Sequence, residues 1–209
     1  KPDPAAHYVK NVLEQYSKDG LAFKRYGRQK QDGRGDDILS GNRLSIVGLY
    51  EGIYGINPMY NRLYLEPHIS PELAGTELRY KYQGKNLLIN LNNDSYSIAC
   101  KGYKITSKER FGFNMDGGQL TYFNRHSANV ALQVKSAQPV ELIIKQWENG
   151  KLEWEQSVSK VTGATLTYTI HQLKPNTNYL LSVSQKSPQK LVSDAKGNLV
   201  LRRNAGAPV

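Results

Sequence analysis

The side chains best suited to chemistry gather in one short glycine-rich stretch. Arg34, Asp36 and Asp37 are followed closely by Asn42 and Arg43. Two carboxyl groups can cleave a glycosidic bond as an acid and base pair, but they must face each other across it, ~5 to 9.5 Å apart. Because Asp36 and Asp37 are chain neighbours, they point apart in an extended loop and cannot form that pair by themselves. A role as ordinary acids ahead of a helix, stabilised by its dipole, is the stronger interpretation.

Other catalytic and metal-binding patterns are missing. The four histidines lie far apart in the sequence, without metal-ligand spacing or a nearby cysteine, so we expect neither a zinc site nor a cofactor. The single cysteine, Cys100, belongs to an alternating apolar run with Tyr96 and Ile98, which favours a small buried hydrophobe over a nucleophile. Dinucleotide-binding and P-loop motifs are absent from the sequence.

Trp147 and Trp154 flank a tight turn and allow two interpretations. They could form a stacking platform for a sugar ring, or a cross-strand packing pair. Strand positions on either side of a turn favour the packing pair.

The charge is basic but evenly spread. The net charge is +10 and the pI about 9.5, yet no more than two basic residues stand side by side. A solvated basic surface therefore explains the surplus better than a nucleic-acid partner. No apolar run approaches the ~18 residues of a membrane span, so we expect a soluble chain. The compartment stays open, with the periplasm and secretion as candidates for a parent protein.

The first 56 residues indicate two helices. Asp3-Pro4 is a good helix start, and apolar residues follow at helical spacing as far as Tyr16. A second helix is expected to about Tyr54, after a cap at Ser40 or Asn42. Its glycines, Gly48 and Gly52, are four residues apart on one face, where they would let another backbone approach closely.

From Leu63 the apolar period changes from 3.6 to 2, which predicts strands. Alternating runs separated by turn residues indicate an antiparallel meander, and we assign residues 57–137 to a β-sandwich. Residues 136–139 are interpreted as a hinge into a second, smaller β-sandwich over 138–209. There Asn149-Gly150 predicts a hairpin, and the segment from Leu173 to Tyr179 resembles the tyrosine corner of fibronectin type III domains. The predicted fold class is thus mainly β with a short α-helical N-terminal segment.

Residues 36–91 resemble the C-terminal end of the six-hairpin (α/α)6-barrel glycoside hydrolases, in which a β-sandwich follows the last barrel helix. The carrying features are the loop through Asp36-Asp37, the helix through Gly48-Leu49-Tyr50, the exit at Tyr54-Gly55-Ile56, and the stretch from Asn61 to His68. The resemblance implies that residues 1–56 are remnant barrel helices. It also implies that loop residues can line the rim of a sugar site, which makes Arg34, Asp36, Asp37, Asn42 and Arg43 candidate substrate-binding residues.

The resulting expectation is that the chain is the tail of a larger carbohydrate-active enzyme. It would complete or brace the barrel without catalytic residues of its own, and would be inactive alone. The chain would interact with carbohydrate only as part of the parent enzyme. The alternative is a stand-alone β-sandwich module that binds carbohydrate or another protein. Without the barrel, the apolar faces of the two helices would be uncovered. We therefore also expect either a homodimer or helices folded back on the first sandwich.

Overall fold

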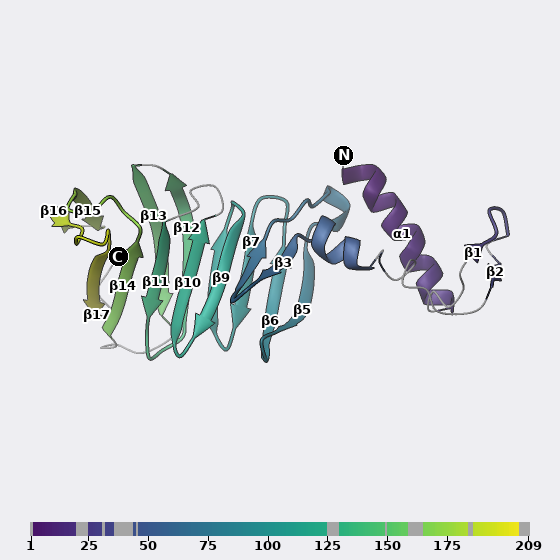
Figure 1. Cartoon of the computed structure of the whole chain (residues 1–209), viewed down its shortest axis with the longest axis horizontal. Helices are drawn as coiled ribbons and strands as arrows, with labels where there is room; N and C mark the ends of the chain where they lie inside the picture. The colour runs from purple at the N-terminus through teal and green to yellow at the C-terminus, as the bar shows by residue number, and fades with distance from the viewer. Residues whose placement is uncertain are drawn as a thin grey trace.

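The computed structural model describes residues 2–19, 25–30, 32–35, 44, 46–124, 130–148, 150–158, 165–183 and 186–204. Strands make up 55% of the chain and helices 16%, which confirms the predicted mainly-β class with an N-terminal helix. Figure 1 shows two large sheets with the helical elements gathered at one end and a small hairpin at the other.

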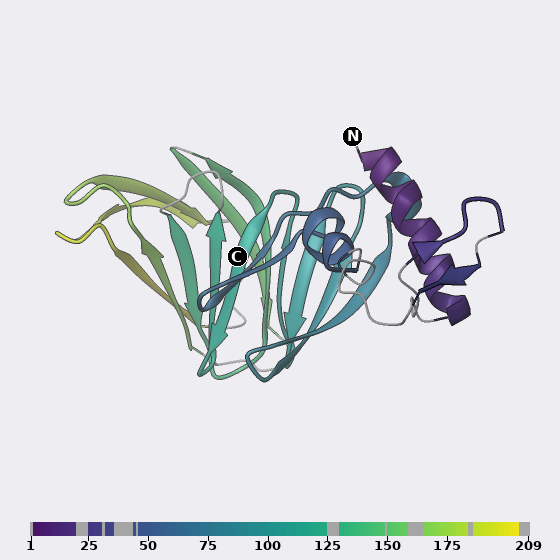
Figure 2. The ribbon, with the colours of Figure 1, turned by 45° about the vertical axis from the view of Figure 1, so that its right-hand side comes forward.

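The N-terminal helix forms where the sequence predicts it. Helix α1 spans Pro2–Asp19. It is followed by a two-stranded hairpin of β1, Arg25–Tyr26, and β2, Gly33–Arg34, in which Tyr26 pairs with Gly33. Figure 2 shows α1 and this hairpin lying beyond the end of the sandwich.

The second predicted helix is present but changes its geometry. Leu44, Ile46 and Val47 are α-helical, and the next turn, η1 at Gly48–Ile53, is a π-helix. The Tyr54 N–H donates to the Leu49 carbonyl at 2.9 Å and continues the wider spacing. Single π turns of this kind frequently occur at functional sites. We call Leu44 and residues 46–53 the helical segment.

One sheet has seven strands in the order β17-β14-β11-β10-β9-β4-β3. Each neighbouring pair in it is antiparallel. Its strands are β3 Ile56–Met59, β4 Arg62–Leu65, β9 Phe111–Asp116, β10 Gln119–Asn124, β11 Ala131–Lys135, β14 Thr165–His171 and β17 Leu199–Asn204.

The facing sheet has six strands in the order β13-β12-β8-β7-β6-β5. The pair β12–β8 is parallel and the others are antiparallel. Its strands are β5 Thr76–Tyr82, β6 Lys85–Leu91, β7 Tyr96–Cys100, β8 Tyr103–Ser107, β12 Val140–Glu148 and β13 Lys151–Val158. A short 3-10 helix, η2 at Pro71–Leu73, precedes β5.

A single hydrophobic core lies between the sheets. Leu65 from one sheet and Ile89 and Ile105 from the other are fully buried within one cluster, which continues to Leu142 and Leu166. Alternation explains this, because every second residue of a strand points to the same face. The strands therefore build the β-sandwich that the sequence predicts.

The expected division at residues 137 and 138 lies inside this sandwich rather than between two sandwiches. Leu142 of β12 pairs with Ile105 of β8, and Ile170 of β14 pairs with Leu132 of β11. The proposed hinge at 136–139 is a fixed crossover between the sheets. Ser136 is buried, its N–H donates to the Gly118 carbonyl at 3.1 Å, and its carbonyl accepts from the Tyr103 hydroxyl at 2.9 Å.

A small hairpin stands outside both sheets near the C-terminal end. It consists of β15, Asn178–Val183, and β16, Lys186–Val192. At its base the Lys174 N–H donates to the Tyr179 hydroxyl at 3.1 Å, which is the corner contact that the sequence predicts. Tyr179 therefore ties its strand to the chain five residues upstream.

Candidate functional site

The helical segment is fastened to one end of the sandwich by two large side chains. Leu49 and Ile53 are 5% and 7% exposed and belong to the core cluster. They are four residues apart, so they share one face of the turn. Burying two such side chains contributes roughly 3 to 6 kcal/mol, which is enough to hold a short segment in place.

The exit from the segment is fixed by a glycine with a left-handed backbone. Gly55 has φ +65°, and a Cβ atom there would overlap the Glu66 carbonyl. The Glu66 N–H donates to the Gly55 carbonyl at 2.8 Å, and the His68 N–H donates to the Ile53 carbonyl at 2.8 Å. The chain leaving the segment is therefore hydrogen-bonded along the end of β4, which sets the direction of the helical turns.

Among the described residues, nothing covers the two glycines on the opposite face of the segment. A Cβ atom built on Gly48 or on Gly52 would meet nothing within 4 Å among the described residues. Leu44 and Val47, on the same side, are 61% and 44% exposed. We call Leu44, Val47, Gly48 and Gly52 the open helical face.

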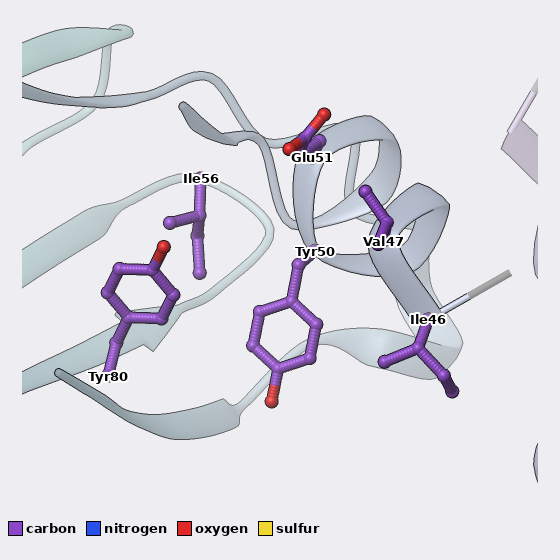
Figure 3. Close-up of a pocket in the computed structure, with 6 residues that line it drawn as sticks. All are labelled: Ile46, Val47, Tyr50, Glu51, Ile56 and Tyr80. Carbon is purple, nitrogen blue, oxygen red and sulfur yellow. The ribbon is translucent and has the colours of Figure 1, made fainter. Parts of the chain in front are cut away.

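A shallow pocket of about 210 Å³ lies beside the open helical face. Figure 3 shows Ile46, Val47 and Tyr50 on the helical segment, with Tyr80 on a neighbouring strand to their left. The pocket is also lined by Glu51 and Ile56. The rings of Tyr50 and Tyr80 are 6.3 Å apart between centroids and tilted by 34°. The lining is mostly apolar and aromatic, with one carboxylate at its edge.

Two tyrosines around this pocket, Tyr54 and Tyr80, are neutral packing groups. Burial raises the pKa of Tyr80, and the nearby Glu51 carboxylate and Tyr50 raise it further. Burial also raises the pKa of Tyr54, and Tyr50 adds to the effect although a hydrogen bond with Thr76 opposes it. A phenol with a raised pKa keeps its proton at neutral pH. These side chains can therefore pack against a partner and donate hydrogen bonds, but they do not supply a nucleophile.

Helix α1 lies against the helical segment and leaves much of its own apolar surface in solvent. Val9 is partly buried against the core cluster. Tyr8, Leu13 and Tyr16 are exposed, and Tyr8 is the most exposed of them at 70%. Apolar side chains are therefore exposed on α1 as well as on the open helical face.

The candidate sugar-site residues stay largely outside the described part of the chain. Asp36, Asp37, Asn42 and Arg43 all lie outside the described residues. Arg34 belongs to β2, where its backbone pairs with Arg25, and its side chain is not described. Their role in substrate binding stays a prediction.

Trp147 lies in the core and Trp154 packs against it. Trp147 is 2% exposed, and its indole N–H donates to the Val130 carbonyl at 3.3 Å. Trp154 is half-buried, with its ring centroid 6.3 Å from that of Trp147 and 6.1 Å from that of Tyr168. The packing interpretation is confirmed, and Trp147 is not available as a sugar platform.

A buried polar cluster beside the tryptophans was not anticipated from the sequence. The Asn124 amide donates to the Glu109 carboxylate at 3.2 Å, to the Tyr122 hydroxyl at 3.2 Å and to the Trp147 carbonyl at 3.5 Å. Burial raises the pKa of Tyr122 to about 12, although hydrogen bonds with Asn124 and Ser107 oppose the shift. The cluster ties β10 and β12 to the turn between β8 and β9, and no local sequence spacing predicts it.

The remaining chemistry-bearing residues are dispersed. Cys100 is buried, and burial raises the pKa of its thiol. His68 lies 3.2 Å from Arg110, and His171 lies 2.9 Å from Asn198, in separate parts of the sandwich. Within the described ranges, no group of three or more His, Cys, Asp or Glu side chains could hold a metal ion. None of the described helices is long and apolar enough to cross a membrane.

Comparison with known proteins finds no matching family model, no matching curated protein and no matching solved structure.

Proposed function

We propose that this chain is a non-catalytic C-terminal portion of a carbohydrate-active enzyme, a glycoside hydrolase, in which it completes or braces a helical barrel. The single observation that carries the proposal is the open helical face. A Cβ atom on Gly48 or Gly52 would meet nothing within 4 Å among the described residues, while Leu49 and Ile53 anchor the same turns to the sandwich.

The occupant that fits this face best is a helix of a catalytic unit. Each glycine costs about 1 kcal/mol in helix stability relative to alanine. Contacts within the described residues do not explain this cost, since a Cβ atom at either position would meet nothing within 4 Å. Glycines at helix faces allow close backbone approach, and the flanking Leu44 and Val47 offer apolar contacts around such a crossing.

The sandwich suits a bracing role because the helical segment is fixed to its core at the attachment point. The helical segment reaches the core through Leu49, and Gly55 fixes its exit beside β4. A partner docked on the open helical face would therefore be held against a pre-formed surface. Preorganisation of this kind lowers the entropic cost of association.

The test is the intact mass and activity of the protein isolated from its own cells with an antibody against the sandwich. The proposal predicts a polypeptide much heavier than the 23.5 kDa of this chain that hydrolyses a glycoside, and no hydrolysis by the 209-residue chain alone. A native polypeptide of this mass, or cleavage by the isolated chain, contradicts it.

A second copy of this chain is the competing occupant of the open helical face. Sedimentation of the isolated chain and of its Gly52→Lys variant separates the two. Dimers that the lysine disrupts, in a native protein of the same 23.5 kDa mass, would assign the face to self-association instead.

A further inference from the structure

A separate groove lies on the outer surface of the six-stranded sheet, across β5, β6 and β7. Its volume is about 630 Å³, within the ~300 to 1,000 Å³ range typical of ligand sites. The outer-face side chains among its lining residues are Arg79, Lys81, Asn86, Leu88 and Ala99, and Lys101 stands at one end.

Strand alternation places these side chains on the solvent side. Tyr80 and Tyr82 of β5 pack on the core, so Arg79 and Lys81 between and before them face outward. On β6 and β7 the same alternation buries Leu87 and Cys100 and turns Leu88 and Ala99 out. Arg79, Lys81 and Asn86 are all exposed, as is Lys101.

The strand register gives the groove a low apolar floor and a cationic rim. Arg79 pairs with Leu88, which pairs with Ala99, so these three residues form one row across the strands. Lys81 pairs with Asn86 in the adjacent row. Lys101 and Gly102 form the turn between β7 and β8, with φ +49° and +82°. The long basic side chains thus surround the short Ala99 and the half-buried Leu88.

Among the described residues, the ion pairs of this sheet do not involve the cations of the groove. The ion pair nearest the groove joins Lys104, which pairs with Ala99, to Glu141 on the next strand, whereas Lys145–Glu155 and Lys151–Glu153 lie toward the other edge of the sheet. Within the described residues, Arg79, Lys81 and Lys101 form no ion pair, and the residues lining the groove include no carboxylate. Three uncompensated cations around a groove favour an anionic ligand.

We infer that this groove binds an acidic oligosaccharide, a sugar chain that carries carboxylate groups. Arg79 can accept a carboxylate in the bidentate geometry of its guanidinium, and the lysines act as point charges. Leu88 and Ala99 offer an apolar surface to the C–H face of a sugar ring. No aromatic side chain faces outward among the lining residues, which disfavours both stacking of neutral sugars and base stacking by single-stranded nucleic acid.

The identification of the anion as a sugar acid rests on the proposed carbohydrate function, whereas the site itself does not depend on the open helical face. The experiment therefore uses the isolated chain. Amide resonances are followed by NMR during titration with tetragalacturonate, with its fully methyl-esterified form as the uncharged match. A single-stranded oligonucleotide is a third arm.

The expected result is a set of shifts at Leu88, Ala99 and Gly102 with tetragalacturonate and none with the methyl ester. Arg79→Gln and Lys101→Gln should each weaken binding about two- to fivefold, because each removes one exposed charge contact. Lys190→Gln, which removes the same charge from the exposed β16, should leave binding unchanged.

Three outcomes overturn the inference: no shifts with tetragalacturonate, equal binding of the methyl ester, or tighter binding of the oligonucleotide. Binding that Lys190→Gln weakens as much as Arg79→Gln would also overturn it, since the general surface charge would then explain the attraction. The spectra report folding of each variant directly. If the native-mass test fails while these shifts appear, the groove stands as a binding site of a stand-alone chain.

Discussion

Gly48 and Leu49 are neighbours in the chain and face opposite environments. Leu49 is 5% exposed within the core of the sandwich, whereas a Cβ atom on Gly48 would meet nothing within 4 Å. The same contrast repeats one turn later between Ile53 and Gly52. One side of the helical segment thus belongs to the sandwich, and among the described residues nothing covers the two glycines on the other side.

The anchoring side of the segment should be energetically costly to disturb. Leu49→Ala should lower the free energy of unfolding by about 2 to 5 kcal/mol, because it leaves a cavity at the end of the core. Urea denaturation followed by fluorescence measures the change. Leu44→Ala is the matched control at a 61% exposed position and should change it by less than about 0.5 kcal/mol. Equal effects at the two positions would contradict the assigned faces.

The glycines of the open helical face should be tolerant in the isolated chain. Gly52→Ala should leave unfolding unchanged or raise its free energy by up to about 1 kcal/mol, since alanine favours helix and has room there. The same denaturation experiment measures it. Gly55→Ala is the contrast, because its added Cβ would overlap the Glu66 carbonyl and should destabilise the fold. A marked loss of stability in Gly52→Ala would show that this face is covered within the chain.

The buried phenol of Tyr122 should make stability fall at alkaline pH. Its pKa in the folded protein is about 12 against an ordinary 10.0, so the unfolded chain ionises first as the pH rises. Its contribution is intact below about pH 10 and is lost between about pH 10 and 12, by roughly 2 to 3 kcal/mol. Tyr122→Phe should flatten that decline when unfolding is measured across this range. Tyr60→Phe, at a 94% exposed position, should not alter it.

The hydrogen bond between Lys174 and Tyr179 near the C-terminal hairpin should contribute modestly to the free energy of unfolding. Tyr179→Phe removes the hydroxyl that accepts the Lys174 N–H, and it should lower the free energy of unfolding by about 0.5 to 1.5 kcal/mol. Thermal unfolding with Tyr60→Phe as the control measures this difference. A neutral result for Tyr179→Phe would mean that water replaces the bond at no cost.

Local sequence pattern predicts the strands well but not their partners. The alternation of Leu87, Ile89 and Leu91 identifies β6, because period-2 burial is a property of neighbouring residues. The parallel pairing of β12 with β8 joins residues 37 positions apart, such as Glu141 and Lys104, and no local spacing encodes that register. Pro139 looks like part of a hinge by composition, yet its segment is fixed by tertiary hydrogen bonds at Ser136.

The candidate sites also include one feature that the sequence predicts and others that only the folded structure brings together. Gly48 and Gly52 are recognisable in the sequence because their spacing of four defines one helix face. The row of rings through Phe111, Tyr122 and Trp147, with centroids 5.8 and 5.1 Å apart, joins three strands that only the folded sheets bring together. The basic groove likewise brings together Arg79 of β5 and Lys101 of the turn between β7 and β8. Because basic residues are spread evenly along the chain, the sequence does not predict this groove.

The most direct test of the bracing proposal is hydrogen exchange at the amides of residues 48–53, compared between the isolated 209-residue chain and the native polypeptide. The account predicts that these amides exchange at least about tenfold more slowly in the native polypeptide, because a docked helix covers the open helical face and suppresses local opening. Amides of β6, in the core of the sandwich, serve as the internal reference. Equal exchange at residues 48–53 in both proteins would contradict the proposal.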